Sequence, residues 1–281
     1  MMPRWPNSRD FDKHESRPDF SIAATPSLAA MPLLYGMQRN TRVGLDLRPP
    51  DVVSSLLDDG LVDAALIPSF ELQRQEKYLT VLGAGCLSCA GTSLAARIYS
   101  HVPAKQLRTI LVDADARTAS AMAQVIWECE FGHKLEVTPY DRNMHEPSAM
   151  QEEGVLVIEN EVVARPPLGF DWQLDLCALW NHMTGLPFVF AVWAAPPGGD
   201  MAAIFSLLEG ARLAGQAHLQ QIAHRSAPHI EWPEDLAERF LAKHMQYEFG
   251  EAQREGLEEF FHLCESFGLT HEFRPVQYFR P

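Results

Sequence analysis

The run Pro187-Phe-Val-Phe-Ala-Val-Trp-Ala194 is apolar throughout and rich in β-branched and aromatic residues. A strand buried on both faces has this composition, because neither face needs polar side chains to meet water. The stretch Pro196-Pro-Gly-Gly199 comes shortly after it and breaks regular structure. The sequence therefore predicts a central strand in a sheet that is covered on both sides.

Short apolar runs and amphipathic stretches alternate before this strand. Further strands are expected at residues 20–24, 61–67, 109–112, 135–137 and 155–158. Helices are expected at residues 28–36, ending at Gly36, from an Asp51 cap to Gly60, at 116–130 and at 174–183. After Gly199 the pattern is helical only, at residues 201–223, 234–246 and 253–266. This order predicts an α/β fold with a largely parallel sheet and a C-terminal helical segment.

The charge of the chain restricts its partners. The formal net charge of −14 over 281 residues would repel nucleic acid and anionic membranes, so we expect neither as a partner. No run reaches the roughly 18 to 20 apolar residues that a membrane span needs. Residues 1–19 are polar, contain no signal-peptide core and are expected to form a disordered tail, which predicts a cytoplasmic protein.

The five cysteines are an odd number scattered along the chain, and we interpret them as reduced. Cys86 and Cys89 have C-x-x-C spacing, but no second pair accompanies them, so a zinc or redox site is disfavoured. No histidine pair with metal-ligand spacing occurs on a predicted helix, and no metal site is predicted. The glycine-rich phosphate-binding motifs and the serine-hydrolase motif are also missing.

The segment Ala116-Arg-Thr-Ala-Ser120 follows a predicted strand and opens a predicted helix. Backbone N–H groups, two hydroxyls and a guanidinium converge there, an arrangement that suits a carboxylate. We therefore predict that Arg117, Thr118 and Ser120 bind substrate. An ordinary helix cap with a solvated arginine is the alternative interpretation.

Two polar stretches add candidate ligand contacts. Gly91, Thr92 and Ser93 join two apolar regions, and their small side chains would let a ligand approach the backbone. Asn160 comes just after the predicted strand at 155–158, where α/β sheets place ligand contacts. A satisfied turn and a surface loop, respectively, would look the same.

Four segments together resemble one family, the chorismate dehydratases of the futalosine route to menaquinone. They are Met31-Pro-Leu-Leu-Tyr-Gly36, Gly60-Leu-Val-Asp-Ala-Ala-Leu-Ile-Pro-Ser69, Arg117-Thr-Ala-Ser120 and Leu179-Trp-Asn-His-Met-Thr-Gly-Leu-Pro-Phe-Val-Phe-Ala-Val-Trp-Ala194. The last segment is the most specific because of its length. With Gly256, Leu257 and Phe260, the resemblance extends over residues 20–269.

This resemblance implies the fold of type II solute-binding proteins, in which a ligand lies between two α/β lobes. Lobe one would comprise residues 20–92 and 188–281, and lobe two residues 93–187. It also implies a cofactor-free lyase that removes water from chorismate, a small dicarboxylate, to leave 3-(1-carboxyvinyloxy)benzoate. Ser69, at the end of the second segment, becomes a further candidate substrate contact.

The sequence departs from the family at two positions. The resemblance places an asparagine shortly before the Pro32-Leu33 motif and a serine in the first of the two segments that connect the lobes. Ungapped counting puts Ala29 and Ala95 at these positions. Both polar groups are missing, so we assign no catalytic residue. Ser27, Cys89, Thr92 or Ser93 could substitute from nearby. A relative that binds a small carboxylate without dehydrating it is therefore the alternative to the enzyme.

Overall fold

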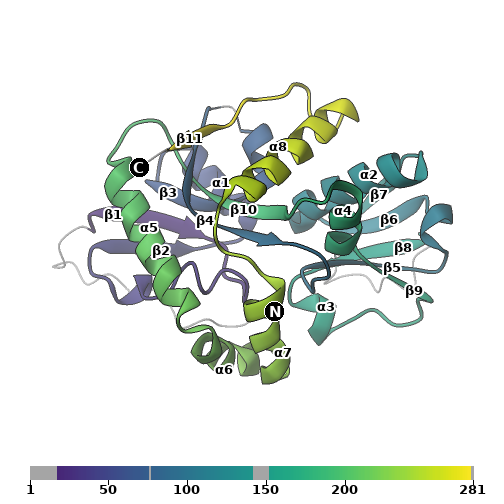
Figure 1. The fold of residues 1–281 in the computed structure, drawn as a ribbon, viewed down its shortest axis with the longest axis horizontal. Coiled ribbons are helices and arrows are strands. Elements are labelled where there is room, and N and C mark those ends of the chain that lie inside the picture. The colour runs from purple at the N-terminus through teal and green to yellow at the C-terminus, as the bar shows by residue number, and fades with distance from the viewer. Residues whose placement is uncertain (1–17, 76, 142–151, 280–281) are drawn as a thin grey trace.

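The computed structural model describes residues 18–75, 77–141 and 152–279. Residues 1–17, which hold most of the predicted tail, lie outside this part of the chain. Two sheets lie side by side, and helices pack against them (Figure 1). The predicted α/β class with helices after the last long strand is confirmed.

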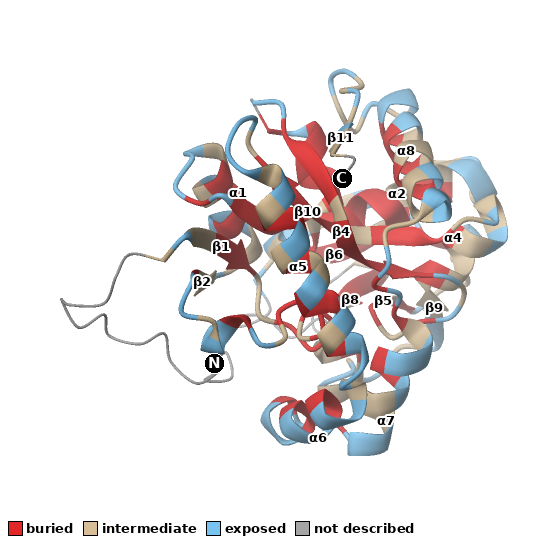
Figure 2. Ribbon diagram, turned by 60° about the vertical axis from the view of Figure 1, so that its left-hand side comes forward, coloured by how far each residue is buried: buried red, intermediate tan, exposed pale blue. Residues whose placement is uncertain are grey.

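The first sheet has six strands in the order β11-β4-β10-β3-β1-β2. Strands β1, β2 and β3 run parallel, whereas β10 runs antiparallel to both of its neighbours, β3 and β4. The bounds are β1 Phe20–Ala24, β2 Val43–Leu47, β3 Ala64–Pro68, β4 Thr80–Cys89, β10 Phe188–Ala195 and β11 Gln277–Phe279. The predicted central strand is thus β10, and its side chains are almost all buried (Figure 2).

The second sheet has five strands in the order β7-β6-β8-β5-β9. Strand β6 runs parallel to β7 and β8, and β5 runs antiparallel to β8 and β9. The bounds are β5 Ala96–Ser100, β6 Thr109–Asp113, β7 Glu136–Tyr140, β8 Gly154–Ile158 and β9 Trp172–Asp175. The chain enters this sheet after β4 and returns to the first sheet at β10. We propose that the lobes divide between residues 92 and 93 and between 187 and 188, as the resemblance implies.

Helices cover the sheets and join the two halves. The bounds are α1 Pro50–Asp58, α2 Arg117–Phe131, α3 Glu161–Ala164, α4 Leu176–Thr184, α5 Met201–Gln216, α6 Leu219–Ile230, α7 Glu234–Arg239 and α8 Glu251–Ser266. One apolar cluster contains Ile67 of the first sheet, Ile110 of the second and Phe260 of α8, so it runs through both halves. A second cluster lies on the other face of the first sheet, under α5 and α6.

Close packing at the return segment depends on Gly256 of α8. A Cβ atom at this position would overlap the carbonyl oxygen of Pro187, which directly precedes β10. Trp180 of α4, Phe188 of β10 and Phe260 of α8 meet edge to face beside it, with ring centroids 5.0–6.0 Å apart. Glycine at 256 thus lets α8 reach the point where the chain re-enters the first sheet.

Several predicted elements need correction. The helix expected at 28–36 is a series of tight turns, because Pro32 has no N–H for a helical hydrogen bond, although Gly36 does adopt the left-handed conformation. Pro49, not Asp51, is the N-cap of α1. In place of the helix expected at 201–223 the structure has two helices, α5 and α6. In place of the helix expected at 234–246 it has α7 followed by a π-helical turn, Phe240–His244.

Candidate functional site

The carboxyl ends of β3 and β6 meet between the two sheets. A short 3₁₀ helix, Ser69–Gln73, follows β3, and α2 begins four residues after β6. The backbone N–H of Phe70 donates a hydrogen bond to Thr118 Oγ1 at 3.3 Å, which joins the two segments. Ligands of α/β sheets bind outside such strand ends. This junction is therefore a candidate ligand-binding site.

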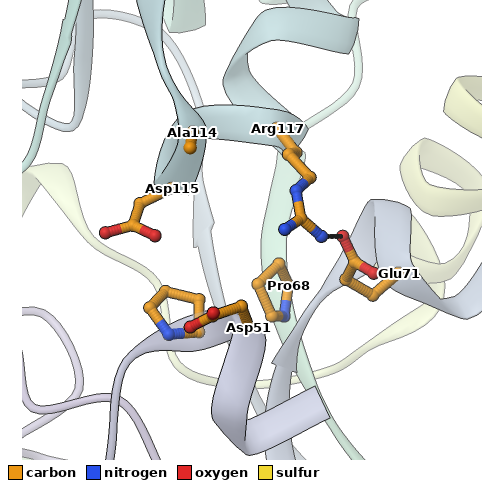
Figure 3. A pocket seen from close by; sticks show the side chains of 7 residues that line it. Asp51, Pro68, Glu71, Ala114, Asp115 and Arg117 are labelled. Atoms are coloured by element: carbon orange, nitrogen blue, oxygen red, sulfur yellow. Dashed lines mark hydrogen bonds and ion pairs between the residues drawn. The ribbon is translucent and has the colours of Figure 1, made fainter. Parts of the chain in front are cut away.

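Arg117, the predicted anion-binding residue, has a carboxylate partner within the protein. Its Nη1 lies 3.0 Å from Oε1 of Glu71, which belongs to the short helix after β3 (Figure 3). The Glu71 side chain is only 9% exposed and also pairs with Arg74, whereas Arg117 is 42% exposed. The guanidinium thus pairs with a residue that follows β3 of the first sheet, while remaining partly exposed to solvent.

A shallow depression opens beside this ion pair. It holds about 230 Å³ of empty space, part of it open to solvent, and is lined by Pro50, Asp51, Pro68, Glu71, Ala114, Asp115 and Arg117. Three carboxylates, of Asp51, Glu71 and Asp115, and the guanidinium of Arg117 line it (Figure 3). The side chains that line it carry more negative than positive charge, which opposes a dianion.

The predicted hydroxyls near this junction are all hydrogen-bonded within the protein. Ser69 is fully buried, and its hydroxyl donates to the carbonyl oxygen of Val189 on β10 at 2.7 Å. Thr118 accepts from Phe70, and Ser120 Oγ lies 3.4 Å from the side-chain nitrogen of Gln124. Ser69, Arg117 and Thr118 therefore come together at the junction, while Ser120 lies one turn along α2.

The segment that joins β4 to β5 is tied to α4. Gly91 has a φ of 80°, a left-handed conformation that glycine adopts without strain. The N–H of Ser93 donates to the carboxylate of Asp175 at 2.9 Å, and its hydroxyl lies 3.0 Å from Cys177 Sγ. Burial raises the pKa of Asp175, against the opposing effect of its hydrogen bonds from Ala178 and Ser93. Among the described residues, the hydrogen bonds of Ser93 go to Asp175, Cys177 and Ala95, and the ion pair of Arg117 goes to Glu71.

A disulfide joins Cys89, the last residue of β4, to Cys177 of α4. The prediction that all cysteines are reduced is therefore wrong for this pair, while Cys86, Cys129 and Cys264 are free. The two partners are 88 residues apart, and nothing in the sequence brings them together. Cys89 belongs to the first sheet, whereas α4 follows β9 of the second sheet. The disulfide therefore links α4 to the first sheet.

Asn160 stands at the carboxyl end of β8, before α3. Its Oδ1 atom is buried and has no hydrogen-bond partner among the described residues. The residue before it, Glu159, has a φ of 53°, which is unusual for a residue with a side chain. The backbone oxygen of Asn160 accepts a hydrogen bond from Trp232 Nε1 at 3.1 Å. The loop after α6 thus reaches across to this strand end.

Ala29 and Ala95 are both buried in the apolar cluster on the α5 and α6 face of the first sheet. Ala95 nevertheless lies beside the β8 strand end, because its carbonyl oxygen accepts the N–H of Glu159 at 2.8 Å. Glu71 and Thr25 were not predicted from the sequence. The Oγ1 atom of Thr25 is buried and has no hydrogen-bond partner among the described residues. Each directly or closely follows a strand, but a sequence shows no sign of burial at such a position.

The described residues show neither a cluster of metal ligands nor a membrane-spanning helix. No group of three or more His, Cys, Asp or Glu side chains there could hold a metal ion. No helix in the same part of the chain is long and apolar enough to cross a membrane.

Solved structures with similar folds define the class. A protein of Archaeoglobus fulgidus superposes with a TM-score of 0.67 at 15% identity, covering 89% of this chain and 98% of its own. The periplasmic aliphatic sulphonate binding protein of Escherichia coli gives 0.63 at 11% identity, covering 94% and 95%. A Candida albicans protein described as having the generic periplasmic binding protein fold gives 0.60 at 13%, covering 91% and 92%. The chain is thus a two-lobed α/β protein of the periplasmic-binding-protein-like class, as predicted.

Sequence comparison identifies the family within this class. The model of a family described as menaquinone biosynthesis matches residues 20–266, so the chain belongs to that family. A chorismate dehydratase of Thermus thermophilus is 35% identical over 109 residues, which are 37% of this chain and 36% of that protein. The match therefore spans about a third of that relative's length.

Proposed function

We propose that the protein is a carbon–oxygen lyase that dehydrates chorismate to 3-(1-carboxyvinyloxy)benzoate, a step of menaquinone biosynthesis. The observation that carries this proposal is the family match, which extends over both sheets, from β1 to the last residue of α8. The partial identity to a chorismate dehydratase supports the same reaction. No cofactor is part of the proposal.

Loss of water from chorismate is driven by aromatisation of the ring. The protein's contribution is to hold a dianion in fixed orientation away from water and to assist departure of a proton and a hydroxyl group. We propose that the contacts come from the predicted set, Ser69, Gly91, Thr92, Ser93, Arg117, Thr118, Ser120 and Asn160. We also propose that the protein acts in the cytoplasm, where a stable disulfide is rare, so the redox state in cells tests this point.

Arg117 is the cation proposed to meet a substrate carboxylate. To do so, its guanidinium would either break its ion pair with Glu71, at 3.0 Å, or contact Glu71 and the substrate carboxylate together. Replacing it with alanine should weaken chorismate binding by about 1.5–3 kcal/mol, the range for a charge-assisted hydrogen bond. Unchanged affinity in calorimetry would mean that the Glu71 pair is the whole role of this side chain.

The direct test is incubation of the purified protein with chorismate, followed by chromatography for the aromatic enol ether. Product at a turnover of about 1 s⁻¹ or faster would establish the enzyme and show that other groups replace the missing polar pair. Absence of both binding and product would refute the proposed substrate.

A second candidate function is a small-carboxylate binding protein that has lost the reaction. Burial of Ala29 and Ala95 in one apolar cluster favours it, because neither side chain can form a hydrogen bond at a reacting centre. In that case the wild type should bind chorismate with little turnover. The double change Ala29→Asn with Ala95→Ser should then raise the rate about 10- to 1,000-fold, and single changes should give less.

A further inference from the structure

We propose that Thr25 is a ligand-binding residue of this protein and acts together with Asn160 from the other sheet. The inference rests on the proposed function for the identity of the ligand, and it adds a residue that the sequence prediction did not include. It starts from two buried oxygen atoms, Thr25 Oγ1 and Asn160 Oδ1, that have no hydrogen-bond partner in the described chain.

Buried polar groups in folded proteins are almost always hydrogen-bonded, since an unpaired one forfeits its hydration. Thr25 is the first residue after β1, and Asn160 is the second residue after β8. Strand β1 runs parallel to β2 and β3, and β8 runs parallel to β6 and antiparallel to β5. Among the described residues, the other unpaired buried side-chain atoms lie within helices or strands, or in segments that do not directly follow such a strand.

The two strand ends border the same apolar cluster. Ala24, immediately before Thr25, belongs to this cluster, as does Ala95, whose carbonyl oxygen holds the N–H of Glu159 at 2.8 Å. Val163 of α3 packs against the cluster, three residues after Asn160. Trp232, also in the cluster, donates its indole N–H to the backbone oxygen of Asn160. One unpaired oxygen from each sheet therefore lies next to a residue that belongs to, or packs against, the same buried cluster.

The backbone at the second oxygen is held in an uncommon conformation. Glu159 has a φ of 53°, which for a residue with a side chain costs free energy unless the surroundings enforce it. Such conformations cluster at binding sites. The turn presents Asn160 beyond the strand end instead of continuing the strand.

The chemistry of the two groups defines a ligand class. A threonine hydroxyl donates to a carboxylate oxygen, whereas an amide oxygen accepts from a hydroxyl. A small hydroxy acid that lies between the two groups satisfies both. Chorismate carries a hydroxyl and one carboxylate on its ring and a second carboxylate on its 1-carboxyvinyloxy side chain, and it is a member of this class.

Thr25→Val tests the inference because valine keeps the shape and removes the hydroxyl. Thr270→Val is the matched control, since Thr270 Oγ1 is equally buried and unpaired but follows α8, away from both strand ends. Calorimetric titration with chorismate should show affinity reduced about 10- to 100-fold for Thr25→Val, as for a hydrogen bond to a charged group. The control should retain the wild-type affinity.

Thermal unfolding without ligand checks the premise separately. Removing an unpaired hydroxyl should leave the melting temperature of Thr25→Val unchanged or raise it. A lower melting temperature would show that the hydroxyl has a partner in the free protein and would overturn the inference. Wild-type affinity for chorismate in Thr25→Val, or an equal loss of affinity in both variants, would also overturn the inference. The proposed function would still stand as long as the wild type binds chorismate. A wild type that binds no chorismate would overturn both.

Discussion

The disulfide between Cys89 and Cys177 should contribute strongly to stability. Both cysteines are buried, so reduction leaves two small thiols in place and creates no cavity. The perturbation is therefore close to a pure loss of the cross-link. It affects the join between β4 of the first sheet and α4, next to the segment that leads into the second sheet.

The magnitude follows from the separation of the partners. A closed loop of 88 residues corresponds to about 4.6 kcal/mol at 25 °C when the cross-link acts by restricting the unfolded chain. Native disulfides typically deliver about 2–4 kcal/mol, because the unfolded state retains structure. We expect reduction to lower the free energy of unfolding by an amount in this lower range.

The assay compares urea unfolding of the wild type before and after treatment with a phosphine reductant. Intact-mass measurement should confirm the gain of two hydrogen atoms on reduction. Cys177→Ser should match the reduced wild type to within the small cost of a buried hydroxyl, and it should no longer respond to reductant. Cys129→Ser is the control, since Cys129 is a free and exposed thiol.

Equal urea midpoints for the oxidised and reduced wild type would refute the reasoning. They would mean either that the bond is absent in solution, which the mass measurement decides, or that the unfolded chain is already confined without it. A response of Cys129→Ser that differs from that of the wild type would point to a cross-link other than the one between β4 and α4.

Three further outcomes follow from single sites. Gly256→Ala should destabilise the fold by about 1–3 kcal/mol in urea unfolding because its methyl group overlaps backbone, whereas Gly210→Ala, a helical site with open space, should be neutral or stabilising. A thiol reagent should label Cys129 in the native protein and leave Cys86 unmodified until unfolding, because burial raises the pKa of Cys86 to about 12. Burial also raises the pKa of Asp175 above its ordinary 3.8. The folded state then holds this proton more tightly, so stability should fall as pH rises from the ordinary pKa through the raised one, and Asp175→Asn should remove that fall in urea midpoints.

The elements that sequence analysis located share a strong periodic or apolar pattern. Strand β10 is apolar on both faces because it lies between β3 and β4, and α2 has an apolar stripe that packs in the core. Strand β4 was missed because two glycines interrupt it and its pairing with β10 is irregular. Strand β9 is short and half exposed, and β11 has three residues whose strand conformation depends on pairing with β4.

The site shows a similar division between local and long-range information. The position of Arg117 at the start of a helix after a strand could be predicted, because the strand and the helix each have a pattern in the neighbouring sequence. Its partner Glu71 was not, since the pair is 46 residues apart and depends on how the two sheets meet. The count that placed Ala29 at a family position holds only if no residue was gained or lost between β1 and Pro32. The structure ends β1 at Ala24 and leaves Thr25 as the first polar side chain beyond it.

The Glu71 pair restricts which ligands Arg117 can recruit. A ligand carboxylate must displace or share a carboxylate that is already 3.0 Å from the guanidinium and held there by the fold. Asp51 and Asp115 line the same depression, and their charges oppose a second anion. A simple monoanion that gains only this contact therefore has little net attraction. If Thr25 and Asn160 bind ligand as proposed, a larger ligand gains further contacts at the β1 and β8 strand ends that offset this repulsion. We therefore expect selectivity for a larger hydroxy acid over small anions.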